Sequence, residues 1–368
     1  MISSSLKRLA VLNAICPYFT MFPIRFPLAI LRKRATPGQW VLDPFCGRGT
    51  TNLAARLLGL PTLGIDSHPL AVAISHAKLL SVTPDEIMGE LDTCLATATK
   101  PRHVPKGRFW ELAYHESVLA SLCVLREAFL DRCDTAPRTA LRAIILGALH
   151  GPLTRTVPSH FSNQSPRTYA PKPAYAVKFW ESRGLSPPYV DIRKLVSRRA
   201  NRYYETGLQP GIGSVRLGDA RSSKAFSCMP RNIGWFITSP PYYGMRTYVP
   251  DQWLRLWFLG GGAQVGYDYE GQLQHGSSEM FAADLRRVWR NCAKRAAPQA
   301  RLVIRFGGIN DRRADPMEIL RLSLRDSGWR IQTRIAAGTA RSGRRQADSF
   351  SRSETTPRDE FDLWATKA

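Results

Sequence analysis

One nonapeptide decides the fold of this chain: Asp43-Pro44-Phe45-Cys46-Gly47-Arg48-Gly49-Thr50-Thr51. It ends a short apolar segment, residues 39–43, that is typical of a buried strand, and it opens a helical pattern over residues 50–58. Its glycines permit a tight turn and a close approach of the backbone to a ligand. The Gly-Lys-Ser/Thr ending of a phosphate-binding P-loop is absent. The nonapeptide therefore predicts a strand–turn–helix unit with a ligand site at the carboxyl end of the strand.

Strands and helices alternate on both sides of a long segment that lacks this alternation. A strand is predicted at 62–66 and a helix at 69–80, and the alternation resumes with strands at 214–217 and 233–238. Later segments predict further elements: helices at 284–296 and 316–327, and strands at 301–306, 329–335 and 361–365. Alternation at this spacing predicts an α/β fold with a doubly wound parallel sheet. The last two strands are expected to close that sheet as an antiparallel hairpin.

The interruption covers residues 84–208 and carries helical patterns, at 111–131 and 138–149, without alternating strands. Because the α/β rhythm resumes after it, we expect a mostly helical insertion within one domain. That domain would comprise residues 1–83 and 209–368.

Acidic residues lie at the carboxyl ends of three predicted strands. Asp43 could meet the cationic amino-acid part of a cofactor. Asp66, followed by Ser67, could accept hydrogen bonds from ribose hydroxyls, although an N-cap before Pro69 is the alternative. Asp219, followed by Ala220, could accept from an adenine amino group, and an ordinary turn aspartate is an equal interpretation. These acids predict a nucleoside-containing cofactor.

The tetrapeptide Ser239-Pro240-Pro241-Tyr242 follows the predicted strand 233–238. An amino group on a base is a poor nucleophile because its lone pair is conjugated into the ring. The Ser239 hydroxyl and Pro240 carbonyl can accept its hydrogen bonds, which favours a pyramidal nitrogen with a free lone pair. The prolines stiffen the loop, and the Tyr242 ring could stack on a flipped base. A Pro-Pro turn after a core strand is the alternative.

The chain contains a second copy of this tetrapeptide, Ser186-Pro187-Pro188-Tyr189. Polar residues without a strand pattern precede it. The position after a strand therefore favours Ser239 as the catalytic copy, and we expect the Ser186 copy to be an ordinary loop.

Together these motifs resemble the amino-methyltransferase family of DNA methyltransferases. Residues 43–51 are similar to its cofactor-binding motif I, 239–242 to its catalytic motif IV, and 19–23, with Phe22 and Pro23, to the segment that packs against the methionine end of the cofactor. The resemblance covers about 1–80 and 212–368, and it implies a Rossmann-like class I methyltransferase sheet and S-adenosyl-L-methionine as cofactor. A tetrapeptide that begins with Ser, and the segment 242–253, are similar to cytosine-N4 members.

The charge of the chain points to a polyanionic partner. Lys and Arg number 52 against 29 Asp and Glu, which gives a net charge of +23. Residues 151–205 alone hold ten basic residues against three acids, with eight aromatic residues between them. We expect this part of the insertion to bind DNA and recognise the target, with a solvated basic face as the alternative. The candidate DNA-binding residues are Arg167, Lys172, Lys178, Arg198, Arg199, Arg202 and, outside the insertion, Arg246.

The predicted function is methyl transfer to N4 of cytosine in double-stranded DNA, with adenine N6 as the alternative product. An RNA methyltransferase and a non-catalytic nucleic-acid-binding module on the same fold are the more distant alternatives. A cognate restriction endonuclease would be a natural partner. The chain has no run of about 18 apolar residues and no cleavable leader pattern, so a cytoplasmic protein without a membrane span is expected. The seven cysteines form no C-x-x-C pair, which argues against a disulfide framework and a zinc site, so we expect free thiols and no metal.

Overall fold

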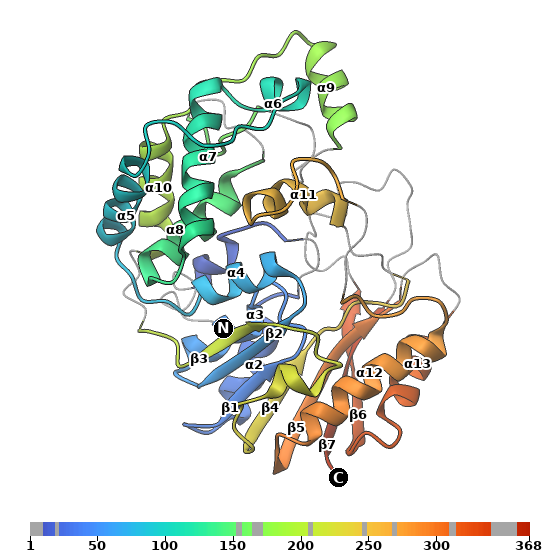
Figure 1. The fold of residues 1–368 in the computed structure, drawn as a ribbon. Coiled ribbons are helices and arrows are strands. Elements are labelled where there is room, and N and C mark those ends of the chain that lie inside the picture. Colours follow the sequence, from blue (N-terminus) through green and yellow to red (C-terminus); the bar gives the residue numbers. More distant parts are fainter. Residues whose placement is uncertain are drawn as a thin grey trace. The chain divides into compact units, whose positions relative to one another are not determined.

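The computed structural model describes residues 10–18, 22–151, 157–163, 172–204, 209–244, 249–266, 271–308, 314–339 and 359–368. The chain divides into two compact units (Figure 1). The sheet unit comprises residues 18–79, 210–247 and 270–368, and the helical unit comprises residues 1–17, 80–209 and 248–269.

The sheet unit is built on a sheet in which the described residues form seven strands, in the order β3-β2-β1-β4-β5-β7-β6. The strands are β1 (Trp40–Asp43), β2 (Thr62–Asp66), β3 (Gly213–Leu217), β4 (Ile233–Thr238), β5 (Ala296–Gly307), β6 (Trp329–Thr339) and β7 (Asp359–Lys367). The pairs from β3 to β5 are parallel, whereas β7 is antiparallel to both β5 and β6. This is a Rossmann-like sheet with an antiparallel final strand, so the predicted fold class and closing hairpin are confirmed.

Helices cover both faces of this sheet, and they are α2 (Arg25–Arg34), α3 (Thr50–Leu57), α4 (Pro69–Ala77), α12 (Ser278–Ala293) and α13 (Pro316–Leu324), with a 3-10 turn η2 (Ser223–Phe226). Alternate strand residues serve opposite cores because successive side chains point to opposite faces. Val41 and Trp235 pack with residues of α2 and α3, while Leu42 and Phe236 pack with residues of α12 and α13. In Figure 1, α12 and α13 lie over one face of β5, β6 and β7.

The predicted boundaries differ from the structure in a few places. The helix predicted at 284–296 spans 278–293, because the Ser277 side chain caps its first turn by accepting from the Met280 N–H at 3.2 Å. The helical pattern at 111–131 forms two helices, α6 (Arg108–Ala113) and α7 (Glu116–Asp131). Tyr114 lies between them in an extended conformation, and its buried hydroxyl donates to the Leu149 carbonyl at 2.8 Å.

The helical unit contains α6 and α7 together with η1 (Ala10–Ala14), α5 (Pro84–Ala96), α8 (Ala136–Ala148), α9 (Pro173–Glu181), α10 (Ile192–Tyr204) and α11 (Val249–Phe258). Most residues of α8 are buried, so this helix forms the centre of the unit. Within the described residues, no helix of either unit is long and apolar enough to cross a membrane.

Two segments outside the predicted insertion, residues 1–17 and 248–269, belong to the helical unit. A Cβ on Gly147 of α8 would lie 2.0 Å from the Ile15 carbonyl oxygen, so η1 and the residues after it lie directly against α8. Arg255 of α11 is buried and donates to the Leu146 carbonyl at 3.0 Å, while Arg126 donates to the Trp257 carbonyl at 2.7 Å. These contacts hold residues 1–17 and 248–269 in the helical unit, whereas the sequence alone predicts that both segments belong to the methyltransferase domain.

Candidate active site at the carboxyl ends of β1 and β4

Asp43, the last residue of β1, lies at the centre of the candidate site and is fully buried. Its Oδ1 accepts from the Thr238 hydroxyl at 2.6 Å and from the Phe45 N–H at 3.1 Å. Its Oδ2 is buried without a hydrogen-bond partner among the described residues. Burial raises the pKa of Asp43 to about 7, although the hydrogen bond from Thr238 opposes this change. A buried carboxylate oxygen without a partner is a natural contact for a cationic ligand.

The turn after Asp43 depends on two glycines in the left-handed region, Gly47 with φ 49° and Gly49 with φ 74°. A Cβ at Gly49 would lie 2.6 Å from Ser75 Oγ, so α4 comes too close for any larger residue. The Cys46 side chain is buried, and burial raises the pKa of its thiol well above the usual range. Cys46 therefore shapes the turn with an inward, neutral side chain, and a cofactor would meet the backbone of the turn.

The remaining side chains of the nonapeptide also pack inward. Thr50 and Thr51 are buried at the start of α3, and the Thr51 hydroxyl donates to the Ile237 carbonyl on β4 at 3.1 Å. Phe45 is partly buried and meets the Trp289 ring edge to face, with centroids 6.1 Å apart. The side chains of the turn thus fix its position against β4 and α12.

Asp66 ends β2 and is tied to the same turn. Its Oδ2 accepts from the Gly47 N–H at 2.8 Å, and its Oδ1 accepts from the His68 N–H at 2.9 Å. Burial raises the pKa of Asp66 to about 6, although both backbone hydrogen bonds oppose this change. The N-cap of α4 is His68, whose ring accepts from the Leu70 N–H at 3.2 Å, so Asp66 is not the N-cap. Asp66 and the adjoining Ser67 are both partly exposed, as the predicted ribose contacts require.

The catalytic tetrapeptide lies beside this turn because β4 pairs with β1 in parallel. The Thr238–Asp43 hydrogen bond joins residues 195 positions apart in the sequence, and Ser239 follows Thr238 directly. Ser239 and Pro241 are partly exposed, while Pro240 is buried. No residue that the structure describes supplies a hydrogen-bond partner for the Ser239 hydroxyl. The two predicted motifs therefore meet at one edge of the sheet.

Tyr242 is oriented differently from the expectation that its ring offers a stacking surface. The ring is 9% exposed and packs edge to face against Phe306, with centroids 5.2 Å apart. Its hydroxyl donates to Glu360 Oε1 on β7 at 2.6 Å. In this conformation Tyr242 belongs to the core. A base could stack on its ring only after this packing opened.

Asp219 lies in the turn after β3 and forms an ion pair there. Both of its carboxylate oxygens accept from the Arg221 guanidinium, at distances between 2.7 and 3.0 Å. Arg221 also donates to the buried Asp284 at 2.7 Å. Burial opposes ionisation of Asp219, but the hydrogen bonds from Arg221 outweigh it and hold its pKa below the usual range. Asp219 is thus an ion-paired turn residue in this structure, and the neighbouring Ala220 is buried.

The upstream segment is described only from residue 22. Phe22 packs on the α2 side of the sheet and meets Phe26 edge to face at 5.4 Å. The Pro23 carbonyl accepts from the Phe26 N–H at 2.9 Å and so starts α2. Residues 19–21 lie outside the described part of the chain, so the contact of this segment with a cofactor stays a prediction.

The other copy of the tetrapeptide lies in an irregular segment of the helical unit, between α9 and α10, as expected. The Tyr189 ring is 64% exposed and meets the His115 ring edge to face at 5.5 Å. In the described residues a helix, α9, precedes Ser186, whereas the strand β4 precedes Ser239.

The candidate DNA-binding residues of the insertion have unequal environments. Lys172, Lys178 and Arg202 are exposed. Arg198 donates to the Pro158 carbonyl, and the partly buried Arg199 donates to the Ser159 carbonyl at 2.6 Å. Burial lowers the pKa of Arg199. Arg199 thus has a packing role, and Arg167 and Arg246 lie outside the described residues.

Sequence reasoning missed Thr238 and Glu360. Thr238 carries a recognisable signal, because it is a polar residue at the end of an otherwise apolar strand next to the tetrapeptide. No sequence signal identifies Glu360, because its contact with Tyr242 depends on the position of β7 between β5 and β6.

Residues 5–77 match the family model of DNA methylases. This match includes the nonapeptide and Asp66, and it confirms over that segment the resemblance that the motifs indicate. No curated protein matches the chain in sequence.

Several solved methyltransferases are distantly similar in structure. The rRNA methyltransferase aviRa from Streptomyces viridochromogenes is 13% identical with a TM-score of 0.41, covering 100% of this chain and 94% of its own. TrmN from Thermus thermophilus is 11% identical with a TM-score of 0.37, covering 98% and 53%. The magnesium protoporphyrin IX methyltransferase (ChlM) from Synechocystis PCC 6803 is 10% identical with a TM-score of 0.36, covering 100% and 86%. The sheet order together with the DNA methylase segment supports the broad class of methyltransferase.

Proposed function

We propose that this protein transfers a methyl group from S-adenosyl-L-methionine to N4 of cytosine in a short sequence of double-stranded DNA, with the target base flipped out. The observation that carries the proposal is the 2.6 Å hydrogen bond from Thr238 to Asp43. It joins the turn that would hold the cofactor to the loop that would hold the amino group.

The residues of the turn fit this cofactor. Asp43 Oδ2 is buried without a described partner and would pair with the ammonium group of the methionine part. Asp66 is partly exposed, and a carboxylate that already accepts two N–H groups retains lone pairs for ribose hydroxyls. When bound, S-adenosyl-L-methionine supplies an electrophilic sulfonium methyl group.

The loop after β4 would prepare the amino group. The Ser239 hydroxyl and the Pro240 carbonyl would accept the two N–H groups of the base, which favours a pyramidal nitrogen and exposes its lone pair. As the nitrogen gains the methyl group it would lose one proton, and these acceptors would help to pass that proton to solvent. The two prolines restrict the backbone of the loop and add no N–H donors that would compete for its carbonyl groups.

The choice of product and substrate rests on two features of the chain. Ser239 as the first residue of the tetrapeptide favours cytosine N4 over adenine N6. The match of residues 5–77 to DNA methylases and the net charge of +23 support DNA as the substrate.

The product is tested by nucleoside mass spectrometry of DNA from cells that express the wild-type protein, with Ser239→Ala as the matched control. We expect N4-methylcytosine with the wild type only. N6-methyladenine alone would overturn the cytosine assignment, and methylation confined to RNA would overturn DNA as the substrate.

The cofactor site is tested by calorimetry with S-adenosyl-L-methionine. Asp66→Asn keeps one acceptor oxygen for the turn and should weaken binding by about 1.5 kcal/mol, because a hydrogen bond to a charged acceptor is lost. Unchanged affinity in a folded Asp66→Asn protein would exclude the ribose role.

A further inference from the structure

Helix α10 has an unusual distribution of charge. Its 13 residues include five basic residues and no acid. Its buried residues, among them Leu195, Val196 and Ala200, lie on one side. Polar residues recur once per turn on another side, where residues 193 and 194 are followed by 197 and 198 and then by 201. At 1.5 Å per residue, the stretch from 193 to 201 spans about 12 Å.

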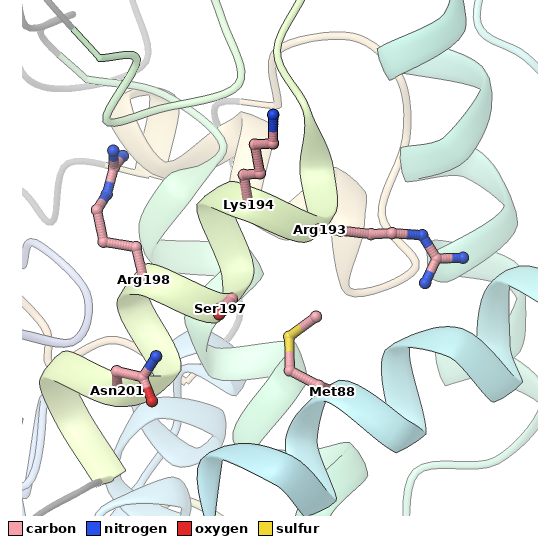
Figure 2. A pocket seen from close by; sticks show the side chains of 6 residues that line it. All are labelled: Met88, Arg193, Lys194, Ser197, Arg198 and Asn201. Carbon is pink, nitrogen blue, oxygen red and sulfur yellow. The ribbon is translucent and has the colours of Figure 1, made fainter.

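This polar face lines an open groove within the helical unit, with a volume of about 590 Å³. The residues that line the groove are Met88 of α5 and Arg193, Lys194, Ser197, Arg198 and Asn201 of α10. Figure 2 shows Lys194 and Arg198 extending from α10, while Met88 reaches from α5 toward Ser197.

The cations of the groove are only partly neutralised. Arg193 pairs with Asp92 of α5, and both side chains are 55% exposed. Lys194 is 87% exposed and lies 3.8 Å from the Asp191 carboxylate. Arg198 donates to the Pro158 carbonyl, and no described carboxylate pairs with it. The groove therefore keeps a positive charge and spare N–H donors.

We propose that this groove binds the phosphate backbone of the DNA substrate. Cations and N–H donors in a row match a row of phosphate oxygens, and about 12 Å corresponds to three or four nucleotides at about 3.4 Å per nucleotide along one strand. The described residues that line the groove include no aromatic ring, and we expect its cations to contact phosphates, which position the DNA without reading its sequence. The identity of the polyanion rests on the proposed function.

The proposal separates basic residues that the sequence groups together, and it removes Arg202 from the candidate DNA-binding residues. Lys194 and Arg198 line the groove, whereas Arg202 of the same helix does not. The Arg202 guanidinium lies 5.7 Å from the centroid of the Tyr203 ring. Arg202 is therefore a matched control, since it has the same charge, is exposed and lies on the same helix.

The test measures binding of the full-length protein to a short DNA duplex over a series of salt concentrations. Lys194→Gln should weaken binding to all sequences alike and reduce the slope of log affinity against log salt by about 0.9, the value for one phosphate contact. Arg202→Gln should leave the slope unchanged. A slope unchanged in Lys194→Gln, or reduced equally by Arg202→Gln, would overturn the groove assignment.

A second variant should change DNA affinity in the opposite direction. Asp92→Asn removes the carboxylate that pairs with Arg193 and should raise affinity and steepen the slope. Asp92 and Arg193 are both half-exposed, so the fold should tolerate the change, which thermal unfolding checks. Affinity that stays constant or falls in folded Asp92→Asn would contradict the proposal. Binding of polyglutamate as tight as that of DNA would also contradict it and would indicate an acidic protein partner.

The binding assay is repeated with the same variants in Ser239→Ala protein, so that DNA binding is measured without methyl transfer. If the groove variants change the salt slope but wild type methylates no DNA, the groove stands and the proposed reaction fails. If wild type methylates DNA while the slope never changes, the reaction stands and the groove fails.

Discussion

Replacement of Asp43 by Asn tests whether the buried carboxyl group at the end of β1 lowers the stability of the folded protein. Asp43 is fully buried, and its Oδ2 has no described hydrogen-bond partner. Asn has nearly the same shape and can still accept from Thr238, but it cannot ionise. We therefore expect Asp43→Asn to stabilise the protein without ligand at alkaline pH and to remove the negative charge proposed to hold the cofactor's ammonium group.

The magnitude follows from the raised pKa. The pKa of Asp43 is about 7 in the folded protein, against an ordinary value of 3.8. The folded state therefore binds this proton more tightly than the unfolded state, and stability is lost as the pH rises from 3.8 through 7. At about 1.4 kcal/mol per pKa unit, the whole loss is about 4 kcal/mol, of which roughly 2.5 kcal/mol falls between pH 5 and pH 8. The Asn side chain has no such dependence.

The assay is urea unfolding of both proteins without cofactor at pH 5 and pH 8. The difference in unfolding free energy should shift by roughly 2.5 kcal/mol in favour of Asp43→Asn between these two values. An unpaired amide N–H in Asp43→Asn would lower its unfolding free energy equally at both pH values, so it does not affect the shift. The titration of groups that both proteins share also cancels in the difference. A difference that stays the same at pH 5 and pH 8 would refute the reasoning from burial.

Three further predictions concern the turn and the loop. Ser239→Ala should lower the methylation rate greatly with little loss of DNA affinity, whereas Ser186→Ala should leave the rate unchanged; the reverse result in a methyl-transfer assay would move the active site to the other copy. Gly49→Ala should lower the unfolding free energy by about 2 kcal/mol or more, because φ is 74° and a Cβ would lie 2.6 Å from a side-chain oxygen of α4. Gly47→Ala, whose nearest atom would be 3.8 Å away, should cost only about 1 kcal/mol, and equal losses in thermal unfolding would contradict the steric argument. Tyr242→Phe should lower the unfolding free energy by about 1.5 kcal/mol, because a 2.6 Å hydrogen bond to a carboxylate on β7 is lost, and an unchanged value would show that this bond contributes nothing.

The sequence by itself determined the fold class and the location of both motifs. Each depends on short-range information: the glycines of the turn, the apolar residues of β1 and β4, and the alternation of strand and helix. The same information separated Ser239 from Ser186, because a strand precedes only the first of them. The closing hairpin of β6 and β7 was likewise predictable from two strand patterns at the end of the chain.

Only the tertiary structure decided which distant residues meet. The contact between Thr238 and Asp43 exists because β4 pairs with β1, and neither segment carries that pairing in its own pattern. The pairing of Asp219 with Arg221, the inward Tyr242 and the placement of residues 248–269 in the helical unit were also beyond local patterns. The physical reason is the same throughout. Periodicity and turn chemistry specify an element, whereas its neighbours are selected by the burial and hydrogen bonding of the whole fold.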